Sequence, residues 1–86
     1  MGEKVVLNDA TREVARAVTK DSVVTCTKTS APDVYVNAIT PKETTTLHAG
    51  DSVPVEKMVP LRLHIFRTSE VNPFGASAEI DISAAT

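Results

Sequence analysis

The sequence predicts a single, mostly β domain, a small sandwich or barrel of about six strands, and three observations support this prediction. Twelve valines and eleven threonines supply β-branched side chains, which fit the pleated surface of a sheet. All five prolines follow residue 30, and none of them could lie inside a long helix. From there on, turn signals recur about every 8–12 residues, the spacing typical of a small all-β domain. With 86 residues, the chain has room for one core.

Residues 1–20 fit more than one structure, so we treat them separately from residues 21–86, the predicted β domain. Asp9 can cap a short helix on which Val14 and Val18 lie four residues apart, and we favour this helix. The same residues also alternate between two faces, as a strand or an extended arm requires, because a spacing of four also satisfies a period of two. The segment is therefore predicted as a short N-terminal helix or an extended N-terminal arm.

The next part of the chain contains two predicted strands separated by a turn. Residues 23–27 are rich in β-branched side chains, and a turn cluster of Ser, Ala, Pro and Asp follows at residues 30–33. Residues 33–39 alternate between two faces, and Pro41 then ends the strand. One face of this strand carries Val34, Val36 and Ala38, and the other carries Tyr35, Asn37 and Ile39.

Four further strands are predicted in the second half of the chain. Residues 43–47 and 52–55 flank Gly50, whose access to positive φ predicts a hairpin or a corner. Pro60–Arg67 alternates most clearly, and residues 76–83 repeat the alternation after a predicted turn at residues 72–75. We expect one buried face to be shared by Leu61, Leu63, Ile65, Ala78, Ile80 and Ile82. The outer face of the first of these strands is expected to carry Arg62, His64 and Phe66.

No assembled catalytic, cofactor or metal motif is present in the sequence, and we predict that the chain is not an enzyme. The tripeptide at residues 50–52, Gly-Asp-Ser, resembles the start of one lipase and esterase class, but those enzymes need a partner histidine in a much larger α/β fold. Cys26 is the only cysteine and is expected to be a small buried hydrophobic residue. His48 and His64 cannot complete a four-ligand zinc set with one cysteine.

Charge and hydropathy exclude several classes of partner. The net charge of −2 and the pI of about 5.6 give no attraction toward nucleic acid or an anionic membrane. Arg12, Arg16 and Lys20 form a basic stripe, but Glu13 and Asp21 dilute it. The N-terminal segment has three consecutive apolar residues, fewer than an export signal or a membrane span requires. We therefore expect a location in a virion or the cytoplasm, with no nucleic acid and no membrane as partner.

The composition predicts dependence on a protein partner. Aromatic residues make up only 3% of the chain, so the core must be built from aliphatic side chains and is thin. Such a domain gains stability when neighbours cover its apolar surface, at about 25 cal/mol per Å². We expect the N-terminal arm to be the interface, with the contact residues Val5, Val6, Leu7, Arg12 and Arg16.

In size and in its Thr/Val/Ala-rich, tryptophan-free composition, the chain resembles the small β proteins that decorate or cement tailed-phage capsids. The resemblance implies a structural protein that forms a homo-oligomer and stabilises a capsid by binding between its subunits. The alternative is a small β-sandwich that binds a protein or glycan. Glycan binding normally uses exposed Trp or Tyr side chains, and this chain has no Trp and one Tyr.

Overall fold

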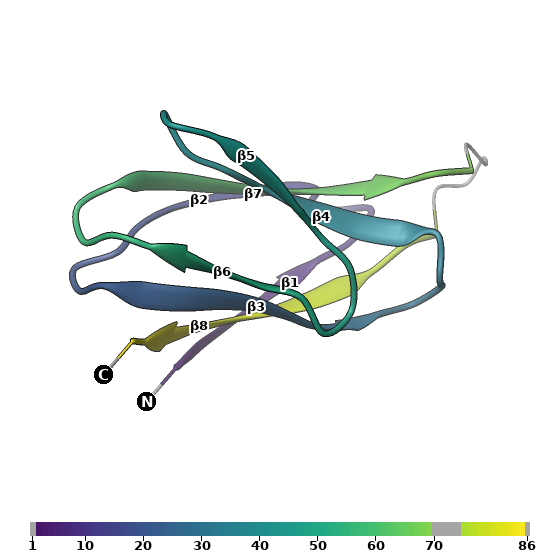
Figure 1. Cartoon of the computed structure of the whole chain (residues 1–86). Helices are drawn as coiled ribbons and strands as arrows, with labels where there is room; N and C mark the ends of the chain where they lie inside the picture. The colour runs from purple at the N-terminus through teal and green to yellow at the C-terminus, as the bar shows by residue number, and fades with distance from the viewer. Residues whose placement is uncertain (1, 70–74, 86) are drawn as a thin grey trace.

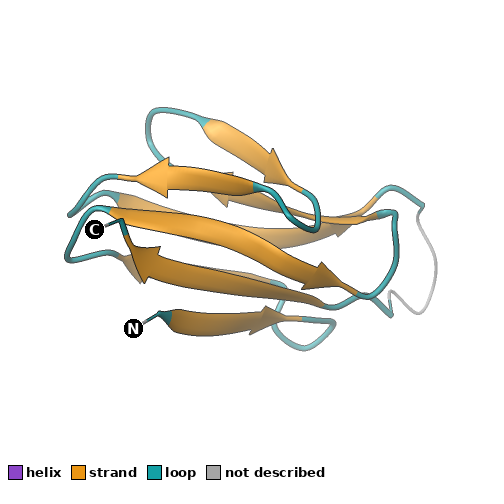
Figure 2. Cartoon of the chain, turned by 60° about the horizontal axis from the view of Figure 1, so that its bottom comes forward, coloured by secondary structure: helices purple, strands orange, loops and turns teal. Residues whose placement is uncertain are grey.

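The structure is a computed structural model and describes residues 2–69 and 75–85 (Figure 1). These residues form eight strands and no helix. Figure 2 shows the strands and the loops that join them. The strands are β1 (Glu3–Leu7), β2 (Glu13–Ala17), β3 (Ser22–Thr29), β4 (Val34–Ile39), β5 (Thr44–Leu47), β6 (Ser52–Val55), β7 (Pro60–Arg67) and β8 (Ala78–Ala84). The predicted mostly β fold is confirmed.

The strands form two antiparallel sheets that face each other as a sandwich (Figure 1). One sheet has the order β1-β8-β3-β6, and the other has the order β2-β7-β4-β5. The first strand therefore pairs with the last, the second with the seventh, the third with the sixth, and the fourth with the fifth. This nested pairing is the topology of a jelly roll, in which one long hairpin is folded over on itself.

Among the described residues, the buried hydrophobic side chains between the sheets are aliphatic apart from Cys26. Period-two alternation places every second residue of each central strand inward, as expected for a sheet with one buried face. The six predicted core residues of β7 and β8 are all buried. They do not share one face, however, because β7 and β8 belong to different sheets, and their side chains meet across the core.

The structure corrects the predicted N-terminal helix or arm. Residues 3–7 and 13–17 are strands β1 and β2, so the alternative of a strand was the right one for the second segment. Val5 and Leu7 are 4% and 0% exposed and belong to the core of this chain. The radius of gyration, 12.3 Å, agrees with the value of about 12 Å expected for one compact domain of this length. In the second segment, the pairing of Glu13–Ala17 with β7 decided between two periods that the spacing alone could not separate.

The connection between β5 and β6 is a corner and not a hairpin, because these strands lie in different sheets. Gly50 adopts a φ of 95°, and its backbone nitrogen donates to the carbonyl of Cys26 at 2.7 Å. The corner is thereby fixed to β3. Of the predicted turn at residues 72–75, residues 72–74 lie outside the described residues. None of the described segments forms a helix with the length and apolar character needed to cross a bilayer.

Candidate functional site

The two outer surfaces of the sandwich differ in chemistry, and the surface of the β2-β7-β4-β5 sheet carries Tyr35 and Phe66, the aromatic side chains of the described residues. Tyr35 on β4 and Phe66 on β7 point outward because their neighbours in each strand, Val34, Val36 and Ile65, point into the core. His64 also lies on this surface, and His48 follows the end of β5. We call the surface formed by Tyr35, His48, His64 and Phe66 the aromatic face.

The rings of the aromatic face form a connected row. Tyr35 and Phe66 are direct partners in the β4–β7 register, and their ring centroids lie 5.6 Å apart. The His64 ring lies 4.3 Å from Phe66, and the His48 ring lies 5.8 Å from Tyr35. Four rings, from strands β4 and β7 and from the corner after β5, therefore cover the middle of this sheet. Cross-strand aromatic pairs of this kind also stabilise the sheet itself.

Polar side chains border the row and leave it close to neutral. The Glu13 carboxylate lies 3.6 Å from the Arg62 guanidinium and 3.8 Å from His64 Nδ1. The Thr46 hydroxyl donates to Asn37 Oδ1 at 2.9 Å, on the opposite side of the row. The aromatic face thus has an apolar centre and a polar border, which is the arrangement found in protein interfaces.

The outer surface of the β1-β8-β3-β6 sheet provides an internal comparison. Among the described residues it carries no aromatic ring and is mainly polar, with Val6, Val23 and Pro54 as its aliphatic side chains, and we call it the polar surface. Thr25 and Ser52 share a hydrogen bond of 2.9 Å, and Lys4 lies 3.9 Å from Glu79. Small hydroxyl side chains and carboxylates of this kind are depleted at protein interfaces, whereas Tyr and Phe are enriched there. A buried aromatic side chain removes about 150–250 Å² from water. Placing the aromatic rings outside an aliphatic core therefore marks the aromatic face as the candidate binding surface.

The predicted interface residues do not form one surface. Val5 and Leu7 are core residues, so of the three apolar residues only Val6, which is 45% exposed on the edge strand β1, is accessible to a partner, whereas Arg12 and Arg16 are exposed. Arg16 donates to Glu3 at 2.8 Å, which links β2 to β1 across the edge of the sandwich. The backbone carbonyl of Arg12 accepts a hydrogen bond from the amide of Ile65 at 3.0 Å. The sequence did contain the signal that identifies the aromatic face. Residues 35, 64 and 66 alternate with apolar core residues in their strands and therefore face outward.

The residues considered for chemistry lie apart from one another. Ser52 bonds to Thr25 on the polar surface, while His48 lies 3.6 Å from Asp51. Cys26 is buried as predicted, and loss of solvation raises the pKa of its thiol, so it is a poor nucleophile. Within residues 2–69 and 75–85, no three His, Cys, Asp or Glu side chains are grouped as a metal would need. No buried polar side-chain atom of this part of the chain lacks a hydrogen-bond partner.

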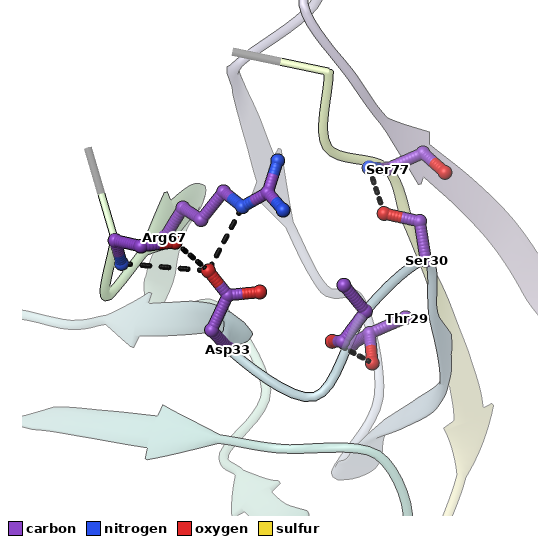
Figure 3. Close-up of polar contacts among 7 residues, drawn as sticks. Thr29, Ser30, Asp33, Arg67 and Ser77 are labelled. Carbon is purple, nitrogen blue, oxygen red and sulfur yellow. Dashed lines mark hydrogen bonds and ion pairs between the residues drawn. The ribbon is translucent and has the colours of Figure 1, made fainter. Parts of the chain in front are cut away.

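A cluster of polar side chains at one end of the sandwich stabilises the fold (Figure 3). Asp33 accepts hydrogen bonds from the Ser69 hydroxyl and from Arg67 Nε, the latter at 2.9 Å. These two donors, Ser69 first, lower the pKa of Asp33 from 3.8 to about 2. Nearby, Ser30 accepts a hydrogen bond of 2.9 Å from the amide of Ser77. The cluster ties the end of β7 and the start of β8 to the connection between β3 and β4.

In comparisons with models of protein families, with curated proteins and with solved structures, nothing matches this chain.

Proposed function

We propose that this chain is a structural protein that docks through its aromatic face onto a larger protein assembly, and that the assembly is a capsid-like shell that it decorates. The contrast between the two outer surfaces carries the proposal. Tyr35 and Phe66 would contribute large apolar areas at the centre of the contact, and Arg62 and Glu13 would lie at its border.

The small aliphatic core supports the same proposal. A chain of 86 residues buries only about 60–65% of the surface of its unfolded state, so its stability is marginal in isolation. Docking would cover the aromatic face and add apolar burial that the core alone does not supply. The jelly roll is also a fold of viral capsid domains, which is an analogy of fold and not of site.

The test measures the particle with which the protein co-sediments in extracts of its native source. We expect the wild type and Thr25→Ala, a control on the polar surface, to sediment with a particle far larger than the 9.2 kDa chain. Phe66→Ala removes the central ring and should move the protein to the slow fractions, provided that circular dichroism shows it folded. Wild-type protein in the slow fractions alone, or an undiminished share of Phe66→Ala on the large particle, would contradict the proposal. Binding of the free protein to a glycan through Tyr35 would favour the alternative of a glycan-binding module.

A further inference from the structure

Each sheet of the sandwich ends in two edge strands, on which one row of backbone groups has no neighbouring strand. Strands β1 and β6 are the edges of one sheet, and β2 and β5 are the edges of the other. Such rows of N–H and C=O groups can pair with another chain, and native proteins block this pairing with charged side chains or with proline. The four edges can therefore be compared for these protective residues.

Three of the four edge strands carry such protection, and β5 does not. Strand β6 contains Pro54, and β1 contains Lys4. In β2, the Arg16 guanidinium donates to the backbone carbonyl of Ala15 at 3.0 Å and covers part of that edge. The sequence of β5 is Thr-Thr-Thr-Leu, which has neither a charge nor a proline. Strand β5 is thus the edge at which a further strand meets the least obstruction.

The backbone groups of Thr44 and Thr46 face the open side of β5. The amide of Thr40 donates to the carbonyl of Glu43 at 2.9 Å, so these two residues form a hydrogen-bonded pair at the end of the β4–β5 hairpin. Hydrogen-bonded and non-hydrogen-bonded pairs alternate along an antiparallel ladder, and the register gives Thr44 and Thr46 the non-hydrogen-bonded positions. Their N–H and C=O groups therefore point away from β4.

This edge is complementary to a second copy of itself. When two β5 strands pair antiparallel with Thr45 opposite Thr45, Thr44 of each copy lies opposite Thr46 of the other copy. Each Thr44–Thr46 pair then exchanges both of its N–H···O=C hydrogen bonds, so the outward groups of both residues are satisfied. Identical copies carry identical charges, and an edge without charge lets them pair without repulsion. Threonine opposite threonine is also a favourable cross-strand pair.

Apolar surface beside β5 supports the same pairing. A slot with a volume of about 90 Å³ lies between β5 and β6, and Thr45, Val53 and Val59 belong to its lining. Val53 and Val59 pack on the core but are only partly buried. In the antiparallel pair, the second copy places its own Thr45 opposite the Thr45 that lines the slot. The pairing therefore covers apolar area next to the edge, which favours association.

We propose that two copies of this chain form a symmetric dimer through β5, in which the two β2-β7-β4-β5 sheets join into one continuous sheet. The two-fold axis is perpendicular to this sheet, so the assembly closes at two copies. The aromatic faces of both copies then lie on the same side of the joined sheet and stay exposed. The dimer does not depend on the proposed function.

Sedimentation velocity of the purified full chain over a wide concentration range tests the dimer. Because β5 has only 4 residues, we expect a weak, reversible monomer–dimer equilibrium. Thr44→Pro should weaken it about tenfold or more, because proline removes one N–H···O=C bond from each copy. The Thr44 amide takes no part in the ladder with β4, so circular dichroism of the dilute monomer should show a folded protein. Val6→Lys, on the edge strand β1, is the control and should leave the equilibrium unchanged.

Two double variants test the register of the pairing. Thr44→Lys/Thr46→Lys places lysine directly opposite lysine and should abolish the dimer, whereas Thr44→Lys/Thr46→Glu places opposite charges there and should preserve it. Both variants lose the same two threonines, so they differ only in the charge at residue 46. If both weaken the dimer alike, the proposed pairing is wrong.

The dimer and the docking proposal can fail separately. Phe66→Ala, on the aromatic face, should not change self-association, although it should abolish docking. A wild type that stays monomeric at all concentrations, assembly beyond two copies, or full dimerisation of Thr44→Pro would overturn the dimer.

Discussion

Leu7 and Val6 are neighbours on β1 that face opposite ways, and replacing each with alanine tests whether the N-terminal segment is a core strand or an arm. Leu7 is 0% exposed, so Leu7→Ala removes a fully packed side chain and should lower the free energy of unfolding by about 2–5 kcal/mol. Val6 is 45% exposed, and Val6→Ala should cost less than about 1 kcal/mol, because only part of its two methyl groups is withdrawn from water.

The loss expected for Leu7→Ala is large for a domain of this size. A chain of 86 residues has a total stability of about 4–13 kcal/mol, so the substitution removes a substantial fraction of it. Urea denaturation followed by circular dichroism measures both variants, with the slope of the transition checked for constancy. Equal losses for the two variants, or no loss for Leu7→Ala, would show that residues 3–7 are not a strand of this core and would restore the arm.

Three further outcomes follow from other parts of the structure. Leu63→Ala should lower the free energy of unfolding by about 2–5 kcal/mol in urea denaturation. Arg62→Ala loses only an exposed ion pair with Glu13 and should lower it by less than about 1 kcal/mol, so similar losses for the two variants would refute the β7 register. The folded state stabilises the ionised form of Asp33, so the contribution of Asp33 to the stability of the fold is complete above about pH 4 and is lost as the pH falls toward 2. Thermal melts over this pH range should show the decrease in stability. Asp33→Asn should melt earlier at neutral pH and lose this part of the pH dependence; an unchanged profile would contradict the assignment.

The strands that alternate without interruption could be predicted from the sequence. In β7, the apolar residues Leu61, Leu63 and Ile65 occupy every second position, which only a strand places on one face. Val14 in β2 and Val18 just after it are four residues apart, and that spacing fits a helix as well as a strand. The strand at Glu13–Ala17 depends on pairing with β7, in which Val14 lies opposite Leu63, almost fifty residues away, and local patterns do not contain this pairing.

The aromatic face shows the same division between local and long-range information. The outward direction of Tyr35, His64 and Phe66 followed from parity within each strand. Their assembly into one row depends on the register that places Tyr35 opposite Phe66, and on the corner that brings His48 beside Tyr35. The nested pairing of the strands determines both this register and the position of the corner. It is a property of the whole topology and cannot be predicted from any single segment.

Docking through the aromatic face can be tested by oxidative footprinting of the assembled particle. Side-chain labelling would be compared between the free chain and the chain on its particle, residue by residue. We predict that labelling of Tyr35, His64 and Phe66 falls strongly on the particle, while labelling of Val23 and Pro54, on the polar surface, stays the same. Unchanged labelling of Tyr35 and Phe66, or protection confined to the polar surface, would contradict the claim.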